Sequence, residues 1–342
     1  MLLLAAPPPL TGALPRLAGH TLVSQWSFHA GWTVAGVVLI SGYLVALRMA
    51  ARRGLRPVSP IRVACFVTGT VLLVATVSSA MGGYAMSVFW VHMIEHLTLI
   101  MVVPVLLVLG HPLTVIRDGL AGAGRTRFEA ALHSAPVSVL TYPLTGLLLY
   151  SAVIVGTHLT SFMDTMAMHP WLMTGEQVLY VVSGWLLFAT LVGSEPIRWR
   201  VPYLLRIVLL LLAMVPDTLV GIVLVQSNRV LFPMMMGMHP AWAPNALRDQ
   251  QISGSLMWAV GDGLMVGVAF GVVVALISGS ATRSPVLGGW LESARRQTLT
   301  THLALSGAEP ANPAEGQVVD VDDDDDLLAA YNQMLARMNK HR

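Results

Sequence analysis

Long apolar runs, separated by short polar and arginine-bearing segments, dominate the pattern of this chain. Seven runs are close to the length of about 20 residues that a helix needs to cross the hydrocarbon layer of a bilayer. They cover residues 27–48, 61–80, 88–109, 137–157, 174–194, 203–225 and 252–277. Because a spanning segment must satisfy its backbone hydrogen bonds internally, we expect an all-α fold, a polytopic membrane bundle of seven transmembrane helices.

The composition supports a membrane protein and excludes several other classes. Hydrophobic residues make up 55% of the chain and charged residues only 11%, and the mean hydropathy is +0.68. There is no Walker loop or dinucleotide fingerprint, so an ATPase or a Rossmann enzyme is not expected. The basic residues are explained by membrane topology, so nucleic-acid binding is not expected either.

The arginines indicate how the chain is oriented, since positive charge near the ends of spans is retained in the cytoplasm. Few arginines lie on the N-terminal side of the expected topology, and these are Arg16, Arg229 and Arg248. The opposite side is rich in them, at Arg48, Arg52, Arg53, Arg56, Arg62, Arg117, Arg125, Arg127, Arg198, Arg200, Arg206, Arg283, Arg295 and Arg296. We therefore expect the N-terminus outside and the C-terminus in the cytoplasm.

Three regions follow from these patterns. Residues 1–26 are expected to be an extracytoplasmic segment, in which Pro7, Pro8 and Pro9 break the short apolar run that a cleaved signal peptide would need. Residues 27–280 form the seven-helix domain. Residues 281–342 are polar and carry the acidic run 322–326, so they are expected to be a largely disordered cytoplasmic tail with a short amphipathic helix near its end.

His92 and His96 stand out in the third apolar run. They lie four residues apart and therefore share one face of a helix inside lipid. A polar face in that setting needs a partner on a neighbouring helix or a function. Two interpretations remain open, a hydrogen-bonded packing pair and a metal site.

Other metal-ligating residue types collect on the side expected to be outside. His158, Asp164 and His169 lie at or in the connection after the fourth span, a methionine-rich segment precedes His239, and Asp249 precedes the seventh span. We take as candidate metal ligands His92, Met93, His96, His158, Asp164, His169, Met238, His239 and Asp249. The alternative is that the methionines fill gaps and that Asp164 and His169 are solvated loop residues.

Copper, as Cu(I), is the metal that this donor set suits best. Imidazole and thioether are ligands that copper accepts, and both are neutral, which suits an apolar site. Zinc would prefer a closed set of cysteine, histidine and carboxylate. Cys65 is the single cysteine, which excludes an internal disulfide, a four-thiolate site and covalent c-type haem attachment.

His92, Glu95 and His96 also spell H-x-x-E-H, the inverted zinc-peptidase signature. That activity needs a water-accessible cleft, whereas this copy lies inside an expected lipid-spanning helix. We therefore do not expect a peptidase. Glu95 points about 100° from each histidine around the helix, so we expect it to face a neighbouring helix.

Two aspartates lie deeper in the spans. Asp217 follows Pro216, whose kink frees a backbone carbonyl, and either a polar cavity or a hydrogen bond to a neighbouring helix explains it. Asp262 lies between Gly261 and Gly263, where we expect packing and hydrogen bonding first and a proton relay second.

Four separated stretches resemble one family. The run Phe89 to Pro112 reads FWVHMIEHLTLIMVVPVLLVLGHP and contains H-M-x-x-H followed by P-x-L-L-x-L-G-x-P; residues 249–262 read DQQISGSLMWAVGD; segments 26–32 and 158–169 agree as well. Together, over about residues 26–280, they resemble the multi-spanning CtaG family of cytochrome c oxidase assembly proteins associated with caa-type oxidases. His92, His96, His158, His169 and Asp249 match motif positions, whereas Glu95 stands where glutamine is expected and Ser253 where alanine is expected.

The resemblance implies a non-enzymatic accessory factor that helps a haem-copper oxidase to mature, with copper delivered at the outer face of a bacterial plasma membrane. It implies the oxidase subunits as partners, within the lipid bilayer, and soluble copper chaperones as candidate donors. Two alternatives stay open: a copper transporter that carries the ion across the membrane, and a haem-binding membrane redox protein that uses histidine pairs.

Overall fold

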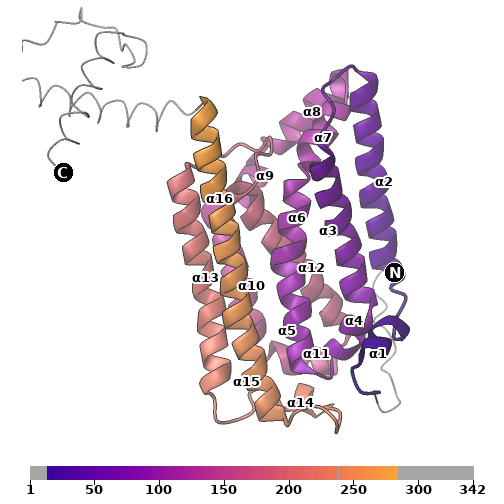
Figure 1. Cartoon of the computed structure of the whole chain (residues 1–342), viewed down its shortest axis with the longest axis vertical. Coiled ribbons are helices and arrows are strands. Elements are labelled where there is room, and N and C mark those ends of the chain that lie inside the picture. Colours follow the sequence, from indigo (N-terminus) through magenta and orange to yellow (C-terminus); the bar gives the residue numbers. More distant parts are fainter. Residues whose placement is uncertain (1–13, 238, 284–342) are drawn as a thin grey trace, which may run out of the picture. The chain divides into compact units, whose positions relative to one another are not determined.

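The computed structural model describes residues 14–237 and 239–283, and all regular structure in these ranges is helical. Residues 1–272 form one compact unit and residues 273–342 a second, of which the described part is the C-terminal end of the last helix. In the first unit, long helices pack side by side (Figure 1). The all-α membrane architecture predicted from the apolar runs is confirmed.

Six helical segments of the described chain are long and apolar enough to cross a membrane. Four are single helices: α2 (Ala30–Arg52), α3 (Pro60–Ser78), α12 (Trp171–Leu191) and α13 (Tyr203–Gln226). The other two are composite. One joins α5 (Phe89–Leu97), the π-helical turn η2 (Thr98–Val102), α6 (Val103–Leu109) and α7 (Pro112–Gly119), and the other joins α15 (Ala246–Leu256), the π-helical turn η3 (Met257–Gly261) and α16 (Asp262–Arg283).

The seventh expected span is a bent pair. Helix α10 (Pro143–His158) and helix α11 (Phe162–Met168) together pass the same test but meet at 65°. The run expected at 137–157 is also interrupted at its start, where the short helix α9 (Ala135–Leu140) ends before Pro143. The described chain therefore has six spans, or seven if the bent pair counts as one.

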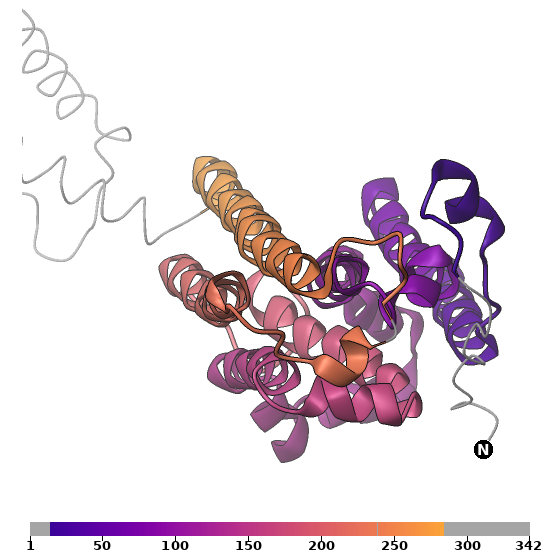
Figure 2. The same ribbon diagram turned by 90° about the horizontal axis from the view of Figure 1, so that it is seen from below.

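Short helices close the two ends of the bundle (Figure 1). At one end lie α7, α8 (Gly122–Leu132) and α9. At the other lie α1 (Gly19–Ser24), α4 (Ala80–Ala85), α11 and α14 (Pro233–Met236). We call the latter the histidine end, since α5 and α12 begin there and α10 finishes there. Viewed from this end, α2 lies at one side of the bundle and α13 at the other (Figure 2).

Close contact between α5–η2 and α12 depends on Gly184. A methyl group at this position would collide with the carbonyl oxygen of Ile100 in η2. Glycine therefore lets the two backbones approach more closely than any side chain would allow, as is common where membrane helices pack. This approach brings the polar side chains of α12 next to the histidines of α5.

The G-H-P turn at the opposite end is held by Glu195. Its carboxylate accepts hydrogen bonds from the backbone N–H groups of Leu113, at 3.2 Å, and Thr114, at 3.0 Å, and from the Thr114 hydroxyl at 2.9 Å. Burial raises the pKa of the Glu195 carboxyl, and the hydrogen bonds from Thr114 and Leu113 oppose that rise. His111, which precedes Pro112, has φ of 52°, a left-handed conformation that is uncommon for a residue other than glycine.

Candidate functional site

Three histidines converge inside the bundle at the histidine end. His92 and His96 lie one turn apart on α5, as their spacing predicts, and His158 is the last residue of α10. The ring centres of His96 and His158 are 5.0 Å apart, and those of His92 and His158 are 6.0 Å apart. None of the three side chains is more than 2% exposed. We call these three residues the histidine cluster.

Most of the ring nitrogens in the histidine cluster have no hydrogen-bond partner. Both nitrogens of His92, both nitrogens of His96 and Nε2 of His158 are buried and unpaired, which makes five of six. The large majority of buried polar side-chain atoms in proteins have a partner. Five unpaired nitrogens on three neighbouring rings are therefore unusual for buried side chains.

His158 is oriented by its own helix. Its Nδ1 lies 3.1 Å from the carbonyl oxygen of Ile154 and 2.8 Å from the hydroxyl of Thr157. Because a carbonyl oxygen can only accept, Nδ1 carries the proton of the neutral ring, and the lone pair of the unpaired Nε2 is free. This is the arrangement in which metal-binding histidines are usually held.

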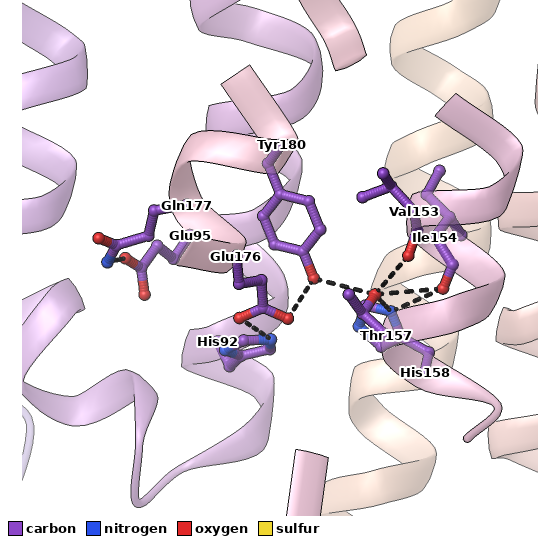
Figure 3. Close-up of polar contacts among 9 residues, drawn as sticks. All are labelled: His92, Glu95, Val153, Ile154, Thr157, His158, Glu176, Gln177 and Tyr180. Carbon is purple, nitrogen blue, oxygen red and sulfur yellow. Dashed lines mark hydrogen bonds and ion pairs between the residues drawn. The ribbon is translucent and has the colours of Figure 1, made fainter. Parts of the chain in front are cut away.

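Helix α12 contributes a carboxylate and a phenol to the same place (Figure 3). Glu176 Oε2 is 3.8 Å from His92 Nε2, an ion-pair distance that is too long for a hydrogen bond. The Tyr180 hydroxyl donates to Glu176 Oε1 at 2.6 Å and lies 3.2 Å from the Thr157 hydroxyl. The Tyr180 ring also meets the His96 ring edge to face, with centres 4.3 Å apart.

These contacts form a continuous polar chain. It runs from Glu176 through Tyr180 and Thr157 to Nδ1 of His158, and so links α12 to α10 beside the two histidines of α5. Tyr180, Thr157 and Glu176 are not among the site residues expected from the sequence. The signal was present, since Glu176 and Tyr180 lie one turn apart in an apolar run and must share a face.

Glu95 faces α12, as its helical position predicts, and not the histidine cluster. Its Oε1 accepts a hydrogen bond from Gln177 Nε2 at 2.7 Å, and Gln177 Oε1 in turn accepts from Trp32 Nε1 at 3.1 Å. The second oxygen, Oε2, is buried and unpaired. Gln177 therefore supplies one of the two partners that a buried carboxyl group would need.

Asp249 holds the beginning of α5. Its Oδ2 accepts from the backbone N–H of Phe89 at 2.8 Å and lies 3.0 Å from His239 Nε2, and its Oδ1 accepts from the N–H of Trp90 at 3.0 Å. These are first-turn amides of α5, which have no acceptor within the helix. The carboxylate is fully buried and also complements the positive end of the helix dipole. Both of its oxygens are engaged, which distinguishes it from the histidine cluster.

The remaining candidate residues lie in other surroundings. Asp164 accepts from the N–H groups of Met234, at 3.0 Å, and Met235, at 3.4 Å, and so caps α14. His169 is exposed at the end of α11, and Met93 is fully buried in the hydrophobic core. Met238 lies outside the described residues. The structure thus brings His92, His96 and His158 together, whereas Asp164 binds the backbone of α14 and His169 is exposed.

A formed metal site is not present in this arrangement. Within residues 14–237 and 239–283, no group of three or more histidine, cysteine, aspartate or glutamate side chains is spaced so as to hold a metal ion. The rings of His92 and His96 each lie close to that of His158, with ring centres 6.0 and 5.0 Å apart. Copper binding at the nine candidate residues stays a prediction.

The fold and the cluster define a polytopic helical membrane protein with a buried, largely unpaired set of imidazoles at one end. Comparison with protein families agrees and is more specific. The profile of the family described as "Cytochrome c oxidase caa3 assembly factor (Caa3_CtaG)" matches residues 41–278, and the chain belongs to this family. The resemblance drawn from the four sequence stretches is confirmed.

Relatives occur in mycobacteria. Uncharacterized proteins of Mycobacterium bovis and Mycobacterium tuberculosis are each 30% identical over 330 residues, which cover 94% of this chain and 45% of theirs. An uncharacterized protein of Mycobacterium leprae is 27% identical over 326 residues, covering 93% of this chain and 45% of its own. The chain thus spans less than half the length of these relatives. No solved structure matches it.

Proposed function

We propose that this chain assists the assembly of cytochrome c oxidase by binding Cu(I) at the histidine cluster and releasing it to the oxidase. The family to which the chain belongs supports the assembly role. The observation that supports the copper role is the set of five buried, unpaired imidazole nitrogens on His92, His96 and His158.

The donor set fits the ion. Neutral imidazoles bind copper readily and can be buried without the large penalty of a charged ligand. Metal–nitrogen bonds to histidine are about 2 Å long, so rings arranged around one ion have centres several ångströms apart. The observed centre-to-centre separations of 5.0 and 6.0 Å are of this order.

The neighbouring residues have supporting roles in this proposal. Glu176, with its Oε2 3.8 Å from His92 Nε2, supplies a carboxylate that offsets the charge of the ion. Thr157 and the Ile154 carbonyl keep Nε2 of His158 available. Asp249 fixes the beginning of α5 and thereby the positions of His92 and His96.

The arginine distribution predicts that the histidine end faces the outside of a bacterial plasma membrane. Copper would then be received there, with soluble copper chaperones as donors and oxidase subunits as acceptors. The role is that of a carrier in assembly, without catalytic turnover. His239, His169, Met234 and Met235 lie on the same end of the bundle and form a candidate entry route for the ion.

Metal analysis of the purified full chain tests the copper site. The protein is loaded with Cu(I) under a reductant in lipid nanodiscs, freed of excess metal, and measured for copper per chain by mass spectrometry. The variant H92A/H96A should lose most of its copper, whereas H133A, an exposed histidine in the connection between α8 and α9, should retain it. In the host, H92A/H96A should also lower the copper content and activity of the oxidase.

Equal copper in wild type and H92A/H96A would contradict the site. A normal oxidase in the host with a copper-free variant would separate metal binding from the assembly role. Copper flux into liposomes that depends on this chain would favour the transporter alternative, and a Soret band after haem supplementation would favour the haem protein.

A further inference from the structure

A second buried polar group lies away from the histidine cluster, between α10, α13 and α16. The Tyr150 hydroxyl on α10 donates to Asp217 Oδ2 on α13 at 2.8 Å. The Thr218 hydroxyl, next along α13, donates to Asp262 Oδ2 on α16 at 2.8 Å. Tyr150 and Asp217 are both fully buried. Two carboxyl groups and two hydroxyl groups from three different spans thus form these two hydrogen bonds. We call Asp217 and Asp262 the aspartate pair.

Each carboxyl group keeps one free oxygen. Oδ1 of Asp217 and Oδ1 of Asp262 are both buried and without a hydrogen-bond partner. A fully buried carboxylate oxygen that lacks a donor is unfavourable by about 1–3 kcal/mol or more, so a donor that reached it would stabilise the bundle.

The surroundings of the aspartate pair are apolar on the side of α5. Gly261, which immediately precedes Asp262, packs beside Asp217, and a methyl group there would lie 3.3 Å from Leu97 and 3.6 Å from Met101. The titratable groups that act on Asp217 are Tyr150 on α10 and Asp262 on α16. Within the described residues neither aspartate forms an ion pair with a basic side chain.

The backbone around the pair is irregular in both spans. Pro216 precedes Asp217 inside α13 and removes one helical hydrogen bond. The π-helical turn η3 ends at Gly261, directly before Asp262. Short π-helical turns occur frequently at functional sites. These two departures from regular helix fall at the two carboxyl groups.

We propose that Asp217 and Asp262 form a proton-binding site in the interior of the bundle, separate from the histidine cluster. Two carboxylate charges that act on one another in an apolar interior, with no basic partner, disfavour full ionisation of the pair. A proton bound by one of the two carboxyl groups removes one charge and turns that group into a hydrogen-bond donor. A metal cation fits less well, since hard cations take six or more oxygen ligands and only two oxygens are free here.

Infrared spectroscopy of the full chain in lipid nanodiscs tests this site. A protonated carboxylic acid has a carbonyl stretching band that a carboxylate lacks and that shifts in deuterated water. The wild type should show such a band at neutral pH, and both D217N and D262N should remove or displace it. Y150F should shift the band without removing it, because the phenol hydrogen bond to Asp217 is lost while both carboxyl groups remain.

The matched control is E129Q. Glu129 is a carboxylate on α8 that is 40% exposed and paired with Arg125, so its replacement should leave the band unchanged. E95Q and E176Q identify any contribution from the two carboxyl groups near the histidine cluster.

Two results would overturn the proposal. One is the absence of a carboxylic acid band at neutral pH, and the other is a band that persists unchanged in D217N and D262N. Suppression of the band by sodium ions at constant ionic strength would assign the site to a metal cation and would equally contradict a proton site. Circular dichroism and thermal unfolding of each variant show whether the bundle is still folded, so a lost band is not mistaken for a lost structure.

Discussion

Replacing Asp249 by alanine should weaken the histidine cluster without removing a metal ligand. The carboxylate accepts hydrogen bonds from two first-turn amides of α5, at 2.8 and 3.0 Å, and lies 3.0 Å from His239 Nε2. In D249A both buried amides lose their acceptor. At about 1–3 kcal/mol for each unsatisfied buried donor, the histidine end should lose about 2–6 kcal/mol of stability.

The affinity of D249A for Cu(I) should also fall, because the beginning of α5 is less well fixed. When the first turn of α5 is no longer held, His92 and His96 lose their fixed positions relative to His158. Binding of Cu(I) must then also restore the order of this segment, and each 1.4 kcal/mol spent in this way lowers the affinity about tenfold. We therefore expect weaker Cu(I) binding with an unchanged number of copper ions per chain, provided that the metal is in excess.

Two measurements check this prediction on the purified chain. Thermal unfolding gives the loss of stability, and a competition titration with a Cu(I) chelator gives the affinity and the stoichiometry. D249N should be intermediate, because an asparagine keeps one acceptor oxygen for α5. The control is D118N, which removes one partner of the surface pair between Arg117 and Asp118; such pairs contribute at most about 1 kcal/mol.

Either of two results would refute this role of Asp249. If D249A unfolded like the wild type, the contacts at the beginning of α5 would not support the fold. If D249N lost copper as completely as H92A/H96A, Asp249 would be a ligand of the metal and not a residue that positions α5.

Three further predictions concern the surrounding structure. G184A should destabilise the bundle by several kcal/mol in thermal unfolding, because a methyl group there would collide with the carbonyl oxygen of Ile100, whereas G175A on the same helix meets nothing within 4 Å and should be tolerated. Y180F should lower Cu(I) affinity in the chelator titration, with a stability loss of about 1–3 kcal/mol, because a buried carboxylate oxygen loses its donor; an unchanged affinity would show that the phenol does not support the site. Burial raises the pKa of the Glu195 carboxyl above its unfolded value, so its contribution to stability is fully present below the unfolded pKa and declines as the pH rises through the folded pKa. The free energy of unfolding of E195Q, relative to that of the wild type, should therefore increase with rising pH. Parallel pH curves for the two proteins would contradict this assignment.

The number and approximate position of the spans could be predicted from the sequence because each depends on local properties. An apolar run of sufficient length must be helical in lipid, whatever surrounds it. The fourth span was the least well predicted. It was expected to start at residue 137, whereas α10 starts at Pro143. Helix α11, which follows α10, is bent from it by 65°.

The candidate site was predictable in part for the same reason. His92 and His96 share a face because four residues make about one helical turn, and Glu95 therefore faces elsewhere. Nothing local shows which distant residues complete the cluster. His158 and His169 flank the same connection in the sequence, yet one enters the bundle and the other is exposed.

The sequence by itself determined that this is a multi-spanning helical membrane protein with two histidines on one buried helix face, since hydropathy and helical period act within a single segment. Only the tertiary structure decided that His158 joins them, that Glu176 and Tyr180 lie beside them, and that Asp249 caps α5. These outcomes depend on how closely helices approach, which is set by contacts such as that of Gly184 with Ile100. Such contacts join residues far apart in the chain, so no local pattern records them.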